Sequence, residues 1–224
     1  MIQNAPQISG TLRKFALRVP ENISNCSGIR IFGKLIKSII FSTDLSIIKN
    51  SNADAIMAVY PFTPQPIITQ ALMLAADIPV FAGVGGGLTQ GKRVLNLAQF
   101  AEMQGAMGVV VNAPTSNNVV RSLSNRVDVP VIVTVVNEEF DFQKRIDNGA
   151  AIFNVSAGSK TPELVEKIRI LHPEFPIIAT GGPTLDSIDK TIEAGANSIT
   201  WTPPSNSEIF RDIMSAYREG KPHP

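Results

Sequence analysis

Two glycine pairs follow apolar runs and are the residues best suited to hold an anion. The first, Gly181-Gly182, comes directly after the run Pro176–Thr180 and before a helical pattern. A glycine pair in this place lets backbone N–H groups approach a phosphate at the N-terminus of a helix. The alternative is a tight turn that needs only the positive φ of glycine. We predict that Thr180, Gly181 and Gly182 bind phosphate.

The second half of such a phosphate site would come from the next loop along the chain. Ser205 and Glu208 have the spacing of a capping box, which would place the Glu208 carboxylate at the N–H groups that a phosphate needs. Pro203 and Pro204 remove two further donors. Ser205 therefore stays a candidate, in a site that depends mainly on Gly181 and Gly182.

The other glycine pair, Gly86-Gly87, opens a loop that runs to Arg93. This loop matches the first seven positions of the P-loop pattern and fails the eighth, where Arg93 replaces the Ser or Thr that would hold magnesium. No Asp ends a neighbouring apolar run to serve as a second metal ligand. The loop therefore predicts a glycine-rich anion site or a flexible lid, and not a nucleotide triphosphatase.

Three charged residues that follow apolar runs are candidates for catalysis: Lys160, Glu138 and Asp44. A lysine there could form a Schiff base or act as a general base, and a carboxylate could move protons. Each has a structural alternative. Lys160 could be an exposed loop residue, and Asp44 could be the N-cap of a helix. Of Glu138 and its neighbour Glu139, at most one would face a site, and the other would start a helix.

The two histidines and the cysteine lie away from these loops. His172 ends a helical pattern before Pro173, His223 is in the C-terminal tail, and Cys26 comes early in the chain. These positions exclude a Ser-His or Cys-His nucleophile and a histidine-based metal cluster at the site. A single cysteine also excludes an internal disulfide framework and a multi-thiolate metal site. We expect no cofactor and no metal.

A βα repeat positions all of these candidates. From residue 38 onward, a short β-branched apolar run, a turn and an amphipathic stretch recur; from the second run to the eighth, the starts are 21 to 29 residues apart, which is the length of one strand plus one helix. The predicted strands are Ser38–Ser42, Ala55–Tyr60, Pro79–Val84, Gly108–Asn112, Pro130–Val136, Ala151–Val155, Pro176–Thr180 and Ser198–Thr202. Their continuous apolar character indicates a parallel sheet covered on both faces.

Eight such units predict an α/β fold, a closed (β/α)₈ TIM barrel, in one domain spanning residues 1–224. An open doubly wound sheet is the alternative. Active sites of TIM barrels lie at the C-terminal ends of the strands, so the strand-end residues Asn112 and Asn154 join the candidates for substrate binding, together with Gly86 and Gly87. The mouth would be polar but lightly charged.

Residues 1–37 precede the repeat and form an N-terminal extension. The spacing of apolar residues in Gln7–Val19 predicts a basic helix, and Ile29–Phe32 with Leu35–Ile36 predicts a short strand pair that turns at Gly33. We expect this segment to plug the bottom of the barrel, because apolar residues there must be covered. The alternative is a lid over the active site.

Composition excludes several classes of function. Twenty Lys and Arg against nineteen Asp and Glu give a formal charge of +1, which does not favour a nucleic acid or an anionic membrane. No apolar run approaches the roughly 20 residues of a membrane span, and Met1–Gly10 lacks the features of a signal peptide. We therefore expect a cytoplasmic protein with no nucleic-acid and no membrane partner.

The stretch Phe140–Pro204 carries a family resemblance in "NGAAIFNVSAG", "IRILHPEFPIIATGGPT" and "IEAGANSITWTPP". It resembles the later half of phosphate-binding TIM barrels, of the keto-deoxy-phosphogluconate aldolase and inosine-monophosphate dehydrogenase types. The aldolase resemblance implies a Schiff-base lysine near Lys160 and phosphate at Gly181-Gly182, although the aldolases carry that lysine within the sixth strand. The cysteine loop and the glycine-rich turn after strand eight that the dehydrogenases have are absent here, which disfavours dehydrogenase chemistry.

Together these features predict an enzyme that acts on a small metabolite. The leading hypothesis is a lyase, aldolase or isomerase for a phosphorylated or carboxylated, sugar-like substrate, working as a homodimer. One alternative is a hydrolase that uses Glu138 or Asp44 to activate water. Another is a barrel without catalysis that binds a metabolite or a protein partner, for which the lightly charged mouth is the motivation.

Overall fold

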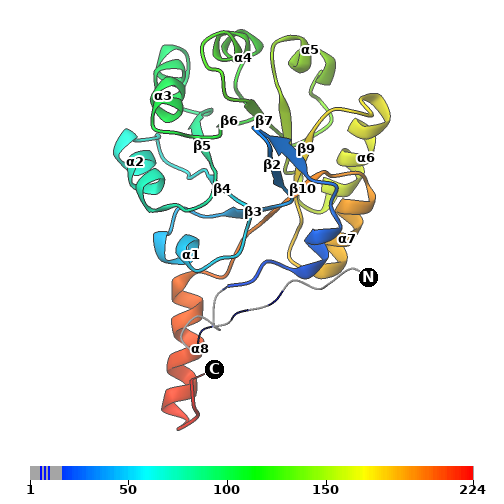
Figure 1. Ribbon diagram of the computed structural model, residues 1–224. Helices are drawn as coiled ribbons and strands as arrows, with labels where there is room; N and C mark the ends of the chain where they lie inside the picture. Colours follow the sequence, from blue (N-terminus) through cyan, green and yellow to red (C-terminus); the bar gives the residue numbers. More distant parts are fainter. Residues whose placement is uncertain (1–5, 7, 9, 11–16, 224) are drawn as a thin grey trace.

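Eight parallel strands close into a barrel in the computed structural model, which describes residues 6, 8, 10 and 17–223 (Figure 1). Around the barrel the strand order is β10-β3-β4-β5-β6-β7-β8-β9. The strands are β3 (Ser38–Phe41), β4 (Ala55–Ala58), β5 (Val80–Gly85), β6 (Gly108–Val111), β7 (Val131–Val135), β8 (Ile152–Val155), β9 (Ile177–Thr180) and β10 (Ser198–Trp201). The predicted (β/α)₈ barrel is confirmed, and each strand begins within one residue of its predicted start.

Helices follow each strand of the barrel, as the repeat requires. They are α1 (Leu45–Lys49), α2 (Pro66–Ala75), α3 (Lys92–Met103), α4 (Asn117–Ser124), α5 (Phe142–Asp147), α6 (Thr161–Leu171), α7 (Leu185–Glu193) and α8 (Asn206–Arg218). Two 3₁₀ helices, η1 (Glu21–Asn25) and η2 (Gly158–Lys160), complete the helical elements of the described residues. In Figure 1 the helices α1 to α7 surround the strands.

The strands are buried on both faces, as their continuous apolar sequences predict. Alternate residues point to opposite sides of the sheet, so each strand contributes to two cores. The inner core fills the barrel and contains Ile39, Met57, Phe81, Val110, Ile132, Ile152 and Ile178. The outer core packs the other face of the strands against the helices, for example Val133 and Ile199 with Leu123 and Ile168.

A β-hairpin adds to the inner core from one end of the barrel. Strands β1 (Ile29–Ile31) and β2 (Lys34–Ile36) pair antiparallel, in agreement with the predicted strand pair. Ile29, Ile31 and Ile36 are buried in the same cluster as the inner residues of the barrel strands. Because β2 leads through Lys37 directly into the start of β3, the hairpin covers the N-terminal end of the barrel, opposite the predicted site.

The helix predicted over Gln7–Val19 lies mostly outside the described residues. Its last three residues, 17–19, are extended and not helical. The N–H group of Leu17 donates to the carbonyl of Asn50 at 2.7 Å, and the N–H of Asn52 donates to the carbonyl of Leu17 at 3.2 Å. A strand-like bridge to the segment after α1 therefore replaces the end of the predicted helix.

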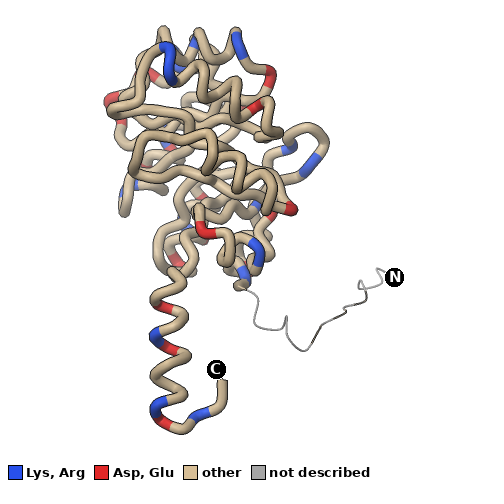
Figure 2. The backbone as a smooth tube through the Cα atoms, turned by 90° about the vertical axis from the view of Figure 1, so that its left-hand side faces the viewer, with Lys and Arg blue, Asp and Glu red and all other residues tan. Residues whose placement is uncertain are grey.

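The last helix, α8, does not join the helical layer. Figures 1 and 2 show it extending away from the barrel, beyond α1 and α7. None of its residues is buried, and its large apolar residues Phe210, Met214 and Tyr217 are exposed. The predicted capping box at its start is confirmed, because Ser205 Oγ accepts from the Glu208 N–H and the Glu208 carboxylate accepts from the Ser205 N–H.

Candidate functional site

A row of uncharged polar side chains follows the inner core toward the C-terminal end of the barrel. In several strands, the residue two positions after an inner-core apolar residue carries an amide or a hydroxyl. Alternation along the strand puts that group on the same inner face. The row, which we call the amide–hydroxyl row, consists of Asn112 after β6, Thr134 on β7, Asn154 on β8, Thr180 on β9 and Thr200 on β10. Thr134 and Asn154 are direct partners in the pairing of β7 with β8.

Two members of this row have oxygens that are buried without a partner. Asn154 is 7% exposed, and its Nδ2 donates to Thr134 Oγ1 at 3.2 Å. Its Oδ1 has no hydrogen-bond partner among the described residues, and the same holds for Oγ1 of Thr200, which is 4% exposed. A buried polar atom left unpaired costs about 1–3 kcal/mol. These atoms would therefore gain from a ligand that pairs with them.

A cavity of about 460 Å³ opens beside the row, at the C-terminal ends of β4, β5 and β6. It is lined by Val59, Tyr60, Pro61, Phe62, Thr63, Pro64, Gly83, Gly85, Gly86, Gly87, Leu88, Thr89 and Asn112. No charged side chain lines it. Asn112 belongs to both the cavity and the amide–hydroxyl row and is the point at which the two meet; the other four members of the row do not line the cavity. The predicted residues Gly86, Gly87 and Asn112 meet here.

At Gly86, the backbone of the loop packs closely against Asn112 and forms part of the cavity wall. Its φ is +116°, and a β-carbon on it would lie 2.3 Å from Cβ of Asn112. The N–H of Gly86 donates to the carbonyl of Thr89 at 2.9 Å within the loop. That N–H is therefore not available to an anion, and the role of Gly86 here is to let the loop approach Asn112.

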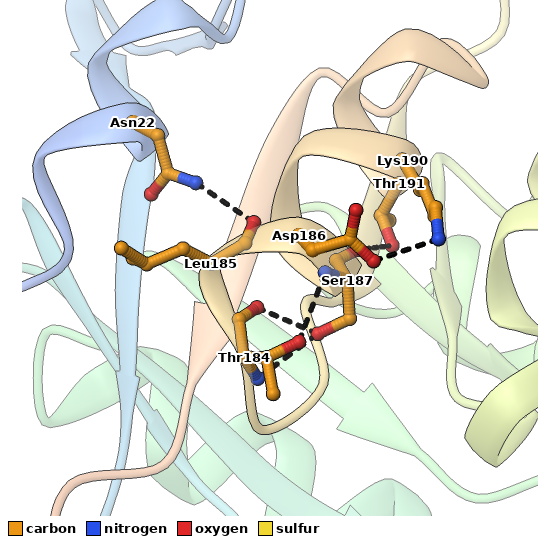
Figure 3. Close-up of polar contacts among 7 residues, drawn as sticks. All are labelled: Asn22, Thr184, Leu185, Asp186, Ser187, Lys190 and Thr191. Carbon is orange, nitrogen blue, oxygen red and sulfur yellow. Dashed lines mark hydrogen bonds and ion pairs between the residues drawn. The ribbon is translucent and has the colours of Figure 1, made fainter.

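The N-terminus of α7, beside the predicted phosphate turn, is capped by its own residues (Figure 3). Thr184 Oγ1 accepts from the N–H of Ser187 at 3.2 Å, and the N–H of Thr184 donates to Ser187 Oγ at 3.1 Å. Asp186 lies in the first turn and pairs with Lys190 at 2.7 Å. The capping bonds therefore already use N–H groups of this helix start, and the carboxylate in its first turn disfavours a second anion there.

The glycines of that turn differ from each other. Gly181 is buried, its N–H donates to the carbonyl of Thr200 at 3.2 Å, and a β-carbon on it would lie 2.7 Å from Ile199. It therefore packs against the outer core and has no N–H left for a ligand. Gly182 is exposed with a φ of +79°, as a turn requires. Of the pair, only Gly182 could contribute an N–H to an anion.

Residues from the N-terminal segment also reach this helix. Asn22 of η1 donates from Nδ2 to the carbonyl of Leu185 at 3.0 Å (Figure 3). The same Nδ2 donates to Asp189 Oδ1 at 2.9 Å. Nearby, Cys26 is buried, and burial raises the pKa of its thiol to about 11. This thiol is protonated at neutral pH and is a poor nucleophile.

Asp44 and Ser205 both lie near the N-terminus of α8. Asp44 is the N-cap of α1 and accepts from the N–H of Ser46 at 2.8 Å and of Ile47 at 3.2 Å. Hydrogen bonds, first from the Ser46 side chain, hold the pKa of Asp44 below its usual range. Asn206 Nδ2 donates to Asp44 Oδ2 at 2.6 Å, which ties the start of α8 to α1.

Glu138 and Lys160 lie on the rim, on the side of α6. Glu138 is exposed and forms an ion pair with Lys167 of α6, and the hydrogen bond from Lys167 lowers the pKa of Glu138. Lys160 ends η2 and is also exposed; its Nζ makes no hydrogen bond and no ion pair with the described residues. Neither residue lines the cavity.

A buried arginine holds the loop that follows Asn112. Arg145 of α5 donates from Nη1 to the carbonyl of Thr115 and from Nη2 to the carbonyl of Ala113 at 3.1 Å. Its guanidinium lies 5.2 Å from the centre of the Phe140 ring, and burial lowers its pKa. It has no carboxylate partner among the described residues. Arg145 therefore positions the loop between β6 and α4.

The sequence predicts only part of this site. Its candidates include Asn112, Asn154, Thr180, Gly86 and Gly87, which the structure places at the C-terminal end of the barrel. Thr134, Thr200 and Arg145 were missed, although period-two alternation along the strands identifies the two threonines. Among residues 17–223 no group of three His, Cys, Asp or Glu side chains gathers as a metal site, and no helix there is long and apolar enough to cross a membrane.

No model of a protein family matches the sequence, and no curated protein matches it. Several solved structures do. A 2,3-dimethylmalate lyase of the PEP mutase/isocitrate lyase superfamily is 13% identical with a TM-score of 0.64, over 95% of this chain and 88% of that one. A phosphonopyruvate hydrolase is 14% identical, with a TM-score of 0.61 over 89% and 86%.

A third structure belongs to another group of barrels. The 4-hydroxy-tetrahydrodipicolinate synthase of Methylacidiphilum fumariolicum is 15% identical with a TM-score of 0.59, over 82% of this chain and 74% of that one. The resemblance to the keto-deoxy-phosphogluconate aldolases and the inosine-monophosphate dehydrogenases stays an expectation. At these identities the similarity establishes the fold alone: the chain is a TIM barrel.

Proposed function

We propose that this chain is an enzyme, a lyase or isomerase, that binds a small oxygen-rich metabolite at the C-terminal end of its barrel. The observation that supports this most is the pair of buried, unpartnered oxygens on Asn154 and Thr200, in the row that reaches an open cavity at Asn112. Asn154 Oδ1 would accept a hydrogen bond from a ligand hydroxyl, and the Thr200 hydroxyl would donate to a carboxylate or carbonyl oxygen. A hydroxy acid carries both kinds of group, whereas an oxo acid carries only acceptors and would meet Thr200 alone.

Lys160 is the strongest candidate for proton transfer in this reaction. It follows β8, the strand that carries Asn154, and its Nζ has no hydrogen bond or ion pair with described residues. Glu138 and Asp44 are weaker candidates, because Glu138 pairs with Lys167 and Asp44 caps α1. For the same reason a hydrolase that activates water with either carboxylate is less favoured. A phosphate group on the substrate would use Gly182 and, secondarily, Ser205.

A barrel that binds its metabolite without transforming it is the second candidate function. Its support is that the amide–hydroxyl row and the cavity contain no charged side chain to move a proton. The two functions share a ligand site and differ only in turnover, so binding and catalysis must be measured separately.

Ligand binding is measured first by thermal unfolding against a panel of hydroxy acids, oxo acids and sugar phosphates. A ligand at 100 times its Kd stabilises the native state by about 2.7 kcal/mol, which raises Tm by roughly 5–10 °C for a chain of this size. We expect such a shift with at least one carboxylate of the panel. No shift with any member would contradict the proposed function.

Asn154→Leu is expected to lose this ligand-induced shift while the stability of the free protein stays within about 1 kcal/mol. Leucine has a similar volume and removes the unpaired oxygen, so the free barrel loses little. Lys160→Met is the companion variant: it keeps the shift, and an enzyme with this variant loses turnover of the ligand identified. A shift that survives Asn154→Leu would place the ligand elsewhere, and turnover that survives Lys160→Met would leave Lys160 without a role.

We propose further that the protein is a homodimer joined through α8. The apolar side chains Phe210, Ile213, Met214 and Tyr217 lie on one side of this helix at helical spacing, beyond Ile209, which packs against the core cluster that contains Ile47 and Ile56. A lone helix of 13 residues is marginal in water, so α8 needs a partner for this stripe. A second copy of α8 would cover this stripe with an identical one, which favours self-association.

Phe210→Glu combined with Met214→Glu is therefore expected to convert a dimer to a monomer, because the charges would be buried in the contact. Sedimentation equilibrium of the full chain measures this directly. Ile170→Glu, at an exposed apolar position on α6, is the matched control and leaves the dimer intact. A monomeric wild-type protein at tens of micromolar would contradict the proposal.

A further inference from the structure

The cavity beside the amide–hydroxyl row differs chemically from the row itself. Its side-chain walls are Val59, the Tyr60 ring, Phe62 and Leu88, with the rest contributed mainly by proline and by glycine backbone. Its few polar side-chain groups belong to Tyr60, Thr63, Thr89 and Asn112. Ligand sites generally combine such an apolar lining with a few polar groups that orient the ligand. A sugar phosphate would find no cation in this cavity.

Two of the apolar residues are exposed to an unusual degree. Phe62 is 74% exposed in the loop between β4 and α2, and Leu88 is 100% exposed in the loop between β5 and α3. A single exposed apolar residue needs no explanation, but these two come from different loops and border the same cavity. They extend its apolar wall outward, where they could contact a ligand.

Hydrogen bonds hold the loops that carry these two residues. The hydroxyl of Tyr60 accepts from the N–H of Gln65 at 2.8 Å, and Nε2 of Gln90 donates to the carbonyl of Gly87 at 2.6 Å. The apolar wall is therefore formed by the fold before a ligand arrives, which reduces the ordering that binding requires.

We infer that this site selects an amphiphilic acid: a hydroxy acid whose hydroxyl and carboxylate meet the amide–hydroxyl row, from Asn112 toward Asn154 and Thr200, and whose aliphatic or aromatic side chain fills the cavity against Phe62 and Leu88. This inference rests on the proposed function and narrows it, because it assigns an apolar substituent to the substrate. It also assigns Phe62 and Leu88 to substrate specificity. Asn112, at the junction of row and cavity, lies where the polar end joins the apolar part.

Two 2-hydroxy acids with the same head and different tails test the inference. Calorimetric titration of the full chain compares 2-hydroxypropanoate with 2-hydroxyoctanoate, and glyceraldehyde 3-phosphate serves as a ligand without an apolar tail. We expect 2-hydroxyoctanoate to bind at least about tenfold more tightly than 2-hydroxypropanoate, since each buried methylene strengthens binding several-fold. Equal affinity of the two acids, or preference for the sugar phosphate, would overturn the inference.

Leu88→Asp is the variant that links the preference to the cavity. It is expected to remove most of the gain from the longer tail and to weaken 2-hydroxypropanoate binding much less. Because Leu88 is fully exposed, this variant should fold. Leu74→Asp, at an exposed leucine on α2 away from the cavity, is the matched control and changes neither affinity.

The outcomes separate the inference from the proposed function. If both acids bind equally and Asn154→Leu weakens both, the polar site stands and the apolar assignment is wrong. If Leu88→Asp weakens the two acids by the same factor, Leu88 has no role in tail recognition and the inference also fails. If no member of the set binds, both the proposed function and the inference are contradicted.

Discussion

Arg145→Ala is expected to lower the free energy of unfolding by about 3 kcal/mol or more, one of the largest effects of a single substitution in this barrel. The guanidinium donates to the carbonyls of Ala113 and Thr115 in a buried place. Alanine would leave both carbonyls without these donors and would remove the contact with the Phe140 ring. A loss of this size lowers Tm by roughly 6–12 °C for a chain of this length.

Two comparisons make the Arg145 measurement specific. Arg121→Ala, at an exposed arginine on α4, is expected to change stability by no more than about 0.5 kcal/mol. Arg145→Met keeps an apolar stem and should recover part of the lost stability, because the aliphatic stem of an arginine contributes packing in addition to the hydrogen bonds of its guanidinium. Thermal and urea unfolding measure all three variants. A loss for Arg145→Ala as small as for Arg121→Ala would show that the two carbonyl contacts do not stabilise the fold.

The strands could be predicted from the sequence because their signal is local. Runs such as Val131–Val135 consist of β-branched residues in a segment between Pro and Asn. A continuous run of this kind is typical of a central parallel strand that is buried on both faces. The strand starts follow directly from these boundaries. The end of the predicted N-terminal helix, at residues 17–19, was wrong because pairing with the segment after α1 overrides a weak helical pattern.

The candidate site was predicted in part. Whether a residue could be placed from the sequence depends on whether it lies on a strand or in a loop. Asn154 and Thr180 lie on strands, where period-two alternation fixes which side chains face the barrel interior. Glu138 and Lys160 follow strands but lie in loops and 3₁₀ turns, where no period fixes the direction of a side chain. Glu138 turns outward to Lys167, 29 positions away, and sequence spacing gives no sign of that pair.

The direction of α8 could not be predicted from the sequence. Its amphipathic pattern and capping box predict a helix that covers the barrel, like the seven before it. Instead, Pro203 and Pro204 and the bonds from Asn206 to Asp44 and Ser46 set the start of the helix at α1, and α8 leaves the barrel. A long-range contact between the first and last units of the repeat, which no local pattern encodes, decides where this helix goes.

Gly86→Ala is expected to weaken ligand binding at the mouth strongly, because it displaces a wall of the cavity. A φ of +116° is unfavourable for alanine, and its β-carbon would lie 2.3 Å from Cβ of Asn112. Strain of this kind costs about 1–3 kcal/mol before the contact is relieved. Relief requires the loop to withdraw from Asn112 or Asn112 to leave its place, and either change displaces groups that the proposed ligand would contact.

The neighbouring glycine provides the matched control. Gly87 has a φ of +62°, within the left-handed region that other residues reach at a cost of about 1–2 kcal/mol, and a β-carbon there meets nothing within 4 Å. Gly87→Ala should therefore lower stability slightly and keep most of the ligand affinity, whereas Gly86→Ala should lower affinity by a factor of about 30 or more. Thermal unfolding with and without the carboxylate ligand measures both effects. If the two alanine variants bind alike, the packing of Gly86 against Asn112 does not shape the site, and the loop between β5 and α3 is separate from the amide–hydroxyl row.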